Sequence, residues 1–127
     1  MRLLHVMLRV VDLERSIHFY EHCMGMRLLR RKDYPKGRFT LAFLGYGDES
    51  TETALELTHN WDKSEYSLGT AYGHIAIQVP DVYAACDEIQ KKGGEISRAP
   101  GPMAESETIL AFVRDPDGYL VELLQRD

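Results

Sequence analysis

Cysteine is scarce in this sequence, whose 127 residues include only Cys23 and Cys86 and no Cys-x-x-Cys pair. Two isolated cysteines exclude the disulfide scaffold that staples many small secreted domains. We therefore expect reduced thiols that fill the core and a protein that works in the cytoplasm. The chain is also shorter than the roughly 150 residues typical of one domain. It predicts a single domain over residues 1–127.

Long hydrophobic runs are lacking as well. A membrane-spanning helix needs about 20 apolar residues, and His5, Arg9 and Asp12 interrupt the apolar start of the chain. Basic residues are outnumbered, since 15 Lys and Arg stand against 20 Asp and Glu, for a net charge of −5. This balance disfavours nucleic acid and anionic membranes as partners. We expect no membrane span, no cleaved leader, and neither a nucleic-acid nor a membrane partner.

What the sequence does contain is an internal repeat. Residues 5–12 read His-Val-Met-Leu-Arg-Val-Val-Asp and residues 74–81 read His-Ile-Ala-Ile-Gln-Val-Pro-Asp, an offset of 69 (74 − 5). The same offset relates the Leu-Ala-Phe strings that begin at 41 and at 110, and it relates Gly25 to Gly94. After a contraction of three residues, Leu-Glu-Leu at 55 matches Val-Glu-Leu at 121. Ordered matches of this kind indicate a duplication, with copies at about 1–62 and 70–127.

Each copy predicts the same order of secondary structure. Alternating apolar and polar residues at 4–10 and 74–79 predict a half-buried strand. An aspartate then caps each predicted helix and glycine ends it, from Asp12 to Gly25 and from Asp81 to Gly93-Gly94. Short strands are expected to follow at 27–31, 39–44 and 53–59, and at 95–98, 108–113 and 119–124. The expected fold is α+β, with two tandem β-α-β-β-β units.

The repeat places potential metal ligands at equivalent points. His5 and His74 open the first strand of each copy, and Glu56 and Glu122 lie within the last strand. Each glutamate stands between apolar residues of the opposite face, so it points away from the apolar layer. If the sheets curl, all four side chains can converge on a concave face. Two imidazoles and two carboxylates suit a divalent first-row metal and leave positions for water or substrate.

Each of these residues also has an ordinary interpretation. A histidine at the start of a strand is usually solvated or capped, and a glutamate within a strand usually lies on its wet face. The duplication aligns His5 with His74 and Glu56 with Glu122, and this match favours their role as metal ligands. His18 and His22 are four residues apart on the first predicted helix, a spacing that can bind metal. They lack the support of the repeat, so we interpret them as a solvated helix face.

Motifs that carry a family resemblance run along essentially the whole chain. Strings such as Asp-Pro-Asp-Gly are weak signals that a whole superfamily shares, whereas the complete set of two histidines and two glutamates is much more specific. The strings are Leu3-Leu4-His5, Met7-Leu8-Arg9-Val10, Phe19-Tyr20, Leu41-Ala42-Phe43-Leu44-Gly45-Tyr46-Gly47, Leu55-Glu56-Leu57-Thr58, Tyr72-Gly73-His74-Ile75-Ala76 and Asp115-Pro116-Asp117-Gly118-Tyr119. Together they closely resemble the glyoxalase I (lactoylglutathione lyase) family of the vicinal oxygen chelate superfamily.

The resemblance implies an activity and an assembly. The family converts the hemithioacetal of methylglyoxal and glutathione to S-lactoylglutathione, by proton transfer through an enediolate whose oxygens a metal stabilises. It implies a homodimer in which His5 and Glu56 of one subunit share each metal with His74 and Glu122 of the partner subunit. A histidine at position 5 and a compact chain resemble the nickel- or cobalt-activated type. We therefore expect Ni²⁺, with Co²⁺ or Zn²⁺ as alternatives, and Glu122 as the base, with Glu56 on the opposite side of the substrate carbon.

Two further residues are assigned to the substrate by the same resemblance. Arg9 and Asn60 stand at positions that bind glutathione in the family, each four residues beyond a predicted ligand on the same strand face. Arg9 also fits an ordinary surface arginine that pairs with an acid. Trp61 either lines the pocket or anchors the linker between the copies.

One segment departs from the family pattern. Glu105 and Glu107 stand before the strand at 108, where a cationic clamp for glutathione is expected. The departure leaves the metal chemistry intact and opens two alternatives. The chain acts on another thiol cosubstrate, or it is a small-molecule binding or resistance protein on the same fold.

Overall fold

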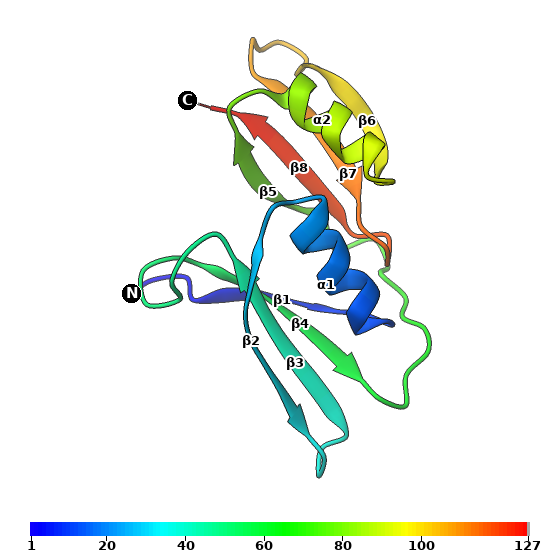
Figure 1. Cartoon of the computed structure of the whole chain (residues 1–127). Helices are drawn as coiled ribbons and strands as arrows, with labels where there is room; N and C mark the ends of the chain where they lie inside the picture. Colours follow the sequence, from blue (N-terminus) through cyan, green and yellow to red (C-terminus); the bar gives the residue numbers. More distant parts are fainter. Residues whose placement is uncertain (127) are drawn as a thin grey trace. The chain divides into compact units, whose positions relative to one another are not determined.

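Two units of like construction follow one another along the chain. The computed structural model describes residues 1–126, and it separates into Met1–Ser67 and a second unit that begins at Leu68. The predicted repeats, 1–62 and 70–127, fall within these two units (Figure 1). The first contains β1 (His5–Arg9), α1 (Leu13–His22), β2 (Arg27–Tyr34), β3 (Phe39–Gly45) and β4 (Ala54–Asn60). The second contains β5 (His74–Val79), α2 (Val82–Lys91), β6 (Glu95–Pro102), β7 (Ile109–Arg114) and β8 (Leu120–Gln125).

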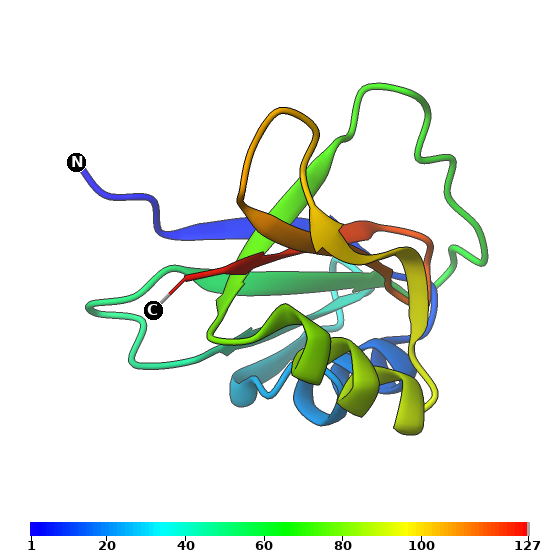
Figure 2. The same cartoon turned by 90° about the horizontal axis from the view of Figure 1, so that it is seen from above.

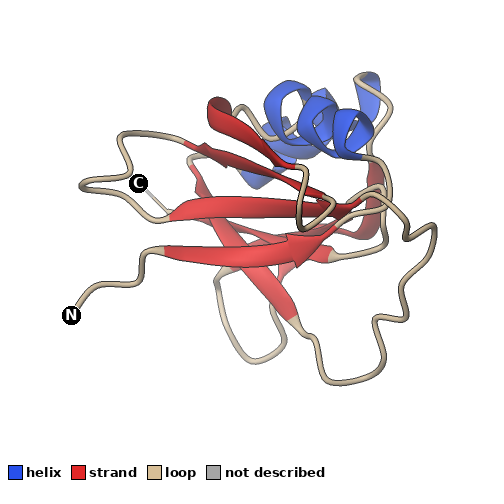
Figure 3. Cartoon of the chain, turned by 90° about the horizontal axis from the view of Figure 1, so that it is seen from below, coloured by secondary structure: helices blue, strands red, loops and turns tan. Residues whose placement is uncertain are grey.

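Each unit is a four-stranded sheet with one helix on its face. The strand orders are β1-β4-β3-β2 and β5-β8-β7-β6, with the first and last strands of each unit parallel and the other pairs antiparallel. Each helix packs on strands of its own unit. Figure 3 shows the helices in blue and the strands in red. The α+β class and the β-α-β-β-β order are therefore confirmed. Neither helix within residues 1–126 is long and apolar enough to cross a membrane.

The helix boundaries follow the predicted signals. The side chains of Asp12 and Asp81 accept hydrogen bonds from backbone N–H groups three residues on, which satisfies donors that the first turn leaves free. Gly25 ends α1 at φ +70°, and Gly93 does the same after α2 at φ +88°. The predicted match of Gly25 to Gly94 is therefore wrong by one residue, because the connection after α1 is one residue longer.

The apolar layer between helix and sheet forms the core of each unit. Its residues come from the helix stripe and from the helix-facing side of the strands, chiefly the two inner strands of each sheet, and burying a leucine-sized side chain is worth roughly 1.5–3 kcal/mol. Cys86 belongs to this layer, as expected, whereas Cys23 is only half-buried; neither is disulfide-bonded. The fully buried members include Val10, Tyr20, Leu44 and Leu57 in the first unit and Val82, Val113, Val121 and Leu123 in the second.

The edge strands are longer than the sequence predicts. β2 and β6 have eight residues each, so they extend beyond the expected ends at 31 and 98. The β2 sequence is polar and mostly exposed, and the β6 sequence contains two prolines and a glycine. It is the hydrogen bonding to β3 and β7 that continues both strands. Figure 2 shows the β6–β7 turn, in orange, standing out beyond the strands, and the long connection 61–73 in green.

Candidate active site

The structure brings the four predicted ligands together as two pairs. His5 Nε2 lies 3.8 Å from Glu56 Oε2, and His74 Nε2 lies 3.7 Å from Glu122 Oε2. The side chains are 41% and 13% exposed in the first pair and 42% and 13% in the second. Each pair thus combines an accessible imidazole with a largely covered carboxylate. The two units present this combination in almost identical form.

Strand register explains why the pairs match. Glu56 stands opposite Met7 on the parallel neighbour β1, and Glu122 stands opposite Ala76 on β5. Each histidine lies two residues before that partner, so it shares a sheet face with the glutamate because side chains alternate along a strand. The residues on either side of Glu56, Leu55 and Leu57, are buried on the other face.

Two aromatic residues complete the pairs, and the sequence argument gave them no role. Phe43 on β3 is the register partner of Glu56, and Phe112 on β7 is the partner of Glu122. Each ring meets the histidine of its unit edge to face, with centroids 5.5 Å apart for His5 and 5.2 Å for His74. The repeated Leu-Ala-Phe string was the signal that could have identified them, because it placed Phe on Phe at the same offset as His on His.

The donor atoms of each His–Glu pair have a type and spacing that fit a divalent metal. Two atoms that each lie about 2.1 Å from one ion are at most about 4.2 Å apart, and both His–Glu separations fall within that span. Imidazole and carboxylate suit nickel, cobalt and zinc alike. Within residues 1–126 no group of three or more His, Cys, Asp or Glu side chains could hold an ion. Each unit therefore presents two donors with a spacing that suits one ion.

The predicted substrate residues lie on the face that carries Glu56. Asn60 follows Glu56 by four residues on β4, and Arg9 is exposed at the end of β1 with Thr58 as its register partner. The amide of Asn60 donates to the hydroxyl of Tyr66 at 3.0 Å, which orients it within the unit. The two side chains thus share one sheet face with the His5–Glu56 pair.

Trp61 is tied to the end of its own sheet. Its indole N–H donates to Thr40 Oγ1 at 2.9 Å, and that hydroxyl donates to Asp33 at 2.7 Å. The Arg38 guanidinium lies 5.5 Å from the ring centroid, and Arg38 also forms a bidentate pair with Asp62 at 2.7 and 2.8 Å. These contacts favour the anchoring interpretation of Trp61.

The remaining singled-out residues are exposed. His18 and His22 stack on the surface of α1 with centroids 4.9 Å apart, as expected of a solvated helix face. Glu105 and Glu107 are exposed in the turn between β6 and β7, which closes through a hydrogen bond from Met103 N to Thr108 O at 2.9 Å. Both carboxylates therefore face solvent within their unit.

The arginines that border the two pairs are held differently. Arg30 on β2 lies over the Phe43 ring at 3.7 Å, and its hydrogen bond to Glu49 raises its pKa, with a further contribution from Glu56. Its counterpart on β6, Arg98, donates instead to the main-chain carbonyls of Gly101 and Leu110 at 3.1 and 3.0 Å. The two guanidinium groups therefore have different partners, a carboxylate for Arg30 and main-chain carbonyls for Arg98.

Comparison with known proteins gives consistent matches over nearly the whole chain. Residues 2–123 match the Glyoxalase/Bleomycin resistance protein/Dioxygenase superfamily. A lactoylglutathione lyase of Neisseria meningitidis serogroup A is 60% identical over 126 residues, which cover 99% of this chain and 91% of that protein. Glyoxalase I from Zea mays matches with a TM-score of 0.96 and 50% identity over 98% of this chain, but only 44% of the maize chain. The trypanothione-dependent glyoxalase I of Leishmania major has a TM-score of 0.87 and 47% identity, over 98% of this chain and 86% of its own.

Proposed function

This chain belongs to the Glyoxalase/Bleomycin resistance protein/Dioxygenase superfamily, and from that premise we propose that it is a lactoylglutathione lyase. Its reaction is the conversion of the hemithioacetal of methylglyoxal and glutathione to S-lactoylglutathione, which removes methylglyoxal. The strongest support is the 60% identity with a lyase of that name over nearly the full length of both chains. The two matched His–Glu pairs supply donors for the chemistry.

The residues that would hold a metal are His5 and Glu56 with His74 and Glu122 of the partner subunit. A divalent ion bound there supplies Lewis-acid stabilisation for negative charge on the oxygens of an enediolate. Nickel is our first assignment, and cobalt or zinc are the alternatives, since all three accept nitrogen and carboxylate donors. The pair geometry supports a shared site because each unit contributes only two of these donors.

The proton is moved by carboxylates. Glu122 takes the proton from C1 of the hemithioacetal, and a proton returned to C2 gives the lactoyl thioester, so the overall change is an isomerisation. Glu122 suits this task because its side chain is largely covered, and a dry site strengthens its interaction with the substrate. Glu56 occupies the matching place in the other unit and faces the opposite side of the substrate carbon.

The shared site requires a homodimer, which can be tested by mixing inactive subunits. A dimer of one His5→Ala chain and one Glu122→Ala chain has one site with both lesions and one with neither. Because half of the dimers in a random mixture are mixed and each has one intact site, about one quarter of wild-type activity should return. No recovery after verified subunit exchange would contradict the sharing.

The thiol is bound by Arg9 and Asn60, which share a face with the His5–Glu56 pair. Glutathione is the first choice, while the acidic turn at Glu105 and Glu107 favours a test of a less anionic thiol. Trypanothione, a polyamine conjugate of glutathione, is such a thiol, and the Leishmania relative is trypanothione-dependent. We also place the enzyme in the cytoplasm, on the support of its two cysteines, neither of which forms a disulfide.

One assay tests the function directly. Metal-free protein is reconstituted with nickel, cobalt or zinc, and thioester formation is followed with methylglyoxal plus glutathione or trypanothione. We expect turnover that depends on metal, with nickel most active. No thioester with any metal or thiol would contradict the lyase and favour the alternative of a small-molecule binding or resistance protein on the same fold.

A further inference from the structure

The two units differ most in the loop between their third and fourth strands. In the first unit this connection spans residues 46–53, eight residues, whereas the corresponding connection 115–119 has five. The three extra residues account for the contraction in the repeat, because the offset is 69 at Phe43 and Phe112 and 66 at Glu56 and Glu122. We call residues 46–53 the Glu49 loop.

The Glu49 loop has its own internal hydrogen bonds. The Asp48 carboxylate accepts from Ser50 N at 2.8 Å, and Asp48 O accepts from Thr51 N at 3.1 Å and Glu52 N at 2.9 Å. The hydrogen bonds from Ser50 lower the pKa of Asp48 below its ordinary value. Glu49 is therefore presented at a defined place.

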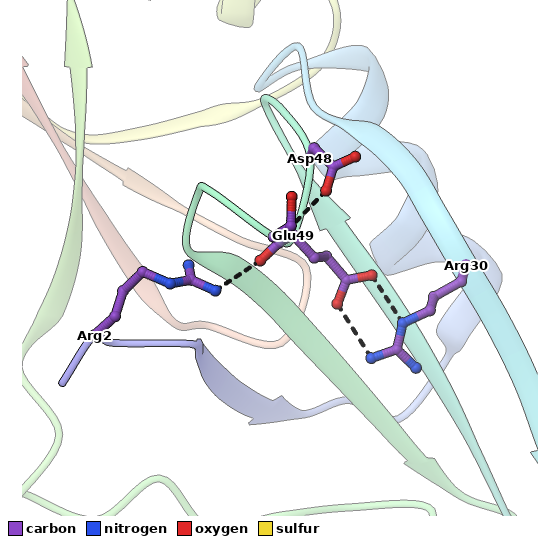
Figure 4. A network of polar contacts seen from close by, with 5 residues as sticks. Arg2, Arg30, Asp48 and Glu49 are labelled. Atoms are coloured by element: carbon purple, nitrogen blue, oxygen red, sulfur yellow. Dashed lines mark hydrogen bonds and ion pairs between the residues drawn. The ribbon is translucent and has the colours of Figure 1, made fainter.

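One side of the loop holds the chain just before His5. Arg2 donates to the main-chain oxygen of Glu49 at 2.8 Å (Figure 4). Thr53 Oγ1 donates to Leu3 O at 2.8 Å. Ala54 N donates to Leu4 O at 3.0 Å directly after the loop. Two of the residues that precede His5 are thus bonded to the Glu49 loop, and Leu4 is bonded to the first residue of β4.

The other side reaches the His5 ring through two side chains. The Glu49 carboxylate accepts two hydrogen bonds from Arg30, at 2.8 and 3.1 Å, as the paired dashed lines of Figure 4 show. This bidentate pairing fixes the plane of the guanidinium, which lies 3.7 Å from the centroid of Phe43. Phe43 in turn meets the His5 imidazole edge to face.

Among residues 68–126 no such chain of contacts occurs at the matching place of the second unit. Arg98 follows a register shift after Ile96, just as Arg30 follows one after Leu28, so the two arginines correspond. The guanidinium of Arg98 donates hydrogen bonds to main-chain carbonyls of β6 and β7, at Gly101, Pro102 and Leu110. The His74–Glu122 pair therefore depends on Phe112 and strand register alone for its orientation among these elements.

We propose that the Glu49 loop is a positioning element for the His5 half of the active site, acting through Arg30 and Phe43, and that the His74 half functions without one. The expected effect on catalysis rests on the proposed lyase function, but the positioning of His5 does not. Glu49 and Arg30 are positioning residues, since they act on His5 through the Phe43 ring. A ligand held in one orientation needs less ordering when metal binds.

The first experiment uses metal-free protein with ¹⁵N-labelled histidine. In Glu49→Gln the imidazole signals of His5 should shift and broaden, while those of His74 stay unchanged, because only His5 lies against Phe43. Glu14→Gln is the matched control, since it breaks an ion pair with Arg31, the next residue of β2, on the other face of the strand. It should change neither histidine.

The second experiment measures metal affinity and kinetics in the same variants. Removing groups that orient metal ligands costs 10- to 100-fold in affinity or activity, and we expect about tenfold weaker nickel binding in Glu49→Gln because its action passes through two side chains. With saturating nickel, kcat should recover while KM for the hemithioacetal stays at the wild-type value. Glu49→Asp, which keeps the charge, should restore part of the affinity.

A double variant tests the route of the effect. If Glu49 acts by holding Arg30, Glu49→Gln combined with Arg30→Gln should be no worse than Arg30→Gln alone, because coupled residues are not additive. Unchanged His5 signals and nickel affinity in Glu49→Gln would overturn the proposal even if the wild type is an active lyase. Changed His5 signals in a wild type without turnover would support the positioning and contradict only the lyase.

Discussion

The two units of this chain share their backbone register and differ in their loops. His5 and Glu56 in the first unit and His74 and Glu122 in the second approach each other to 3.8 and 3.7 Å, with the same aromatic neighbour. The connections around them have diverged in length and charge. The duplicated sheet therefore reproduces the positions of the histidine and the glutamate, whereas the surrounding loops determine which side chains contact them.

The largest expected difference between the units is catalytic. Glu122→Gln should lower kcat by about 10²- to 10⁴-fold, the range for loss of a general base, and Glu56→Gln should lower it less at equal metal content. The measurement is kcat for each variant after its bound nickel has been quantified. Circular dichroism and the dimer mass serve as controls for folding. Near wild-type activity in Glu122→Gln would reject its assignment as base.

The cores of the two units should be equally sensitive to a cavity. Leu57 and Leu123 occupy matching positions and are 0% and 1% exposed, so either Leu→Ala change should reduce the free energy of unfolding by about 2–5 kcal/mol. Urea unfolding followed by tryptophan fluorescence and circular dichroism gives both values. Leu28→Ala, on an exposed edge, is the control and should cost far less. A large difference between Leu57→Ala and Leu123→Ala would show that the matched cores pack unequally.

The turns of the two edge hairpins carry opposite charge, which leads to a smaller effect. Lys36 is exposed in the first unit and Glu105 in the second. If Glu105 repels the carboxylates of glutathione, Glu105→Lys should lower KM a few-fold, since exposed charge interactions are worth under about 1 kcal/mol. The effect should fade with salt, because the Debye length is about 8 Å at physiological ionic strength. Lys36→Glu is the comparison variant, and a KM insensitive to both salt and Glu105→Lys would rule the idea out.

The smallest expected effect concerns a tyrosine in the Glu49 loop. Partial burial raises the pKa of Tyr46 to about 12, although the residue is 51% exposed, and its hydroxyl donates to Met24 O at 2.7 Å. Because the folded state keeps the phenol neutral, its contribution is fully present below pH 10, the ordinary value, and is lost as the pH rises toward 12. Between pH 8 and pH 11, the urea midpoint of unfolding should fall further in the wild type than in Tyr46→Phe. Equal losses in both proteins would contradict the shift.

Much of the fold could be predicted from local patterns. Asp12 and Asp81 cap helices where expected, because a side-chain oxygen that satisfies a free N–H works within four residues of sequence. The alternation of apolar and polar residues around Glu56 predicted the sheet face on which it lies. The duplication predicted that His5 and Glu56 correspond to His74 and Glu122. The roles of the four ligands, the dimer and the metal stay predictions that the experiments above test.

Patterns along the chain predict the order of elements, the repeat, and the face on which each histidine and glutamate lies, since all three depend on near neighbours and on period. The side chains that support them could be found only from their three-dimensional contacts. Phe43, Arg30 and Glu49 come from two strands and a loop, and their contacts with one another span up to 19 residues of sequence. The matching Arg98 turned to carbonyls of its own hairpin instead. Arg30 and Arg98 hold matching positions but have different partners, because each guanidinium bonds to the groups that folding brings within its reach. The three extra residues of the Glu49 loop place a carboxylate within reach of Arg30.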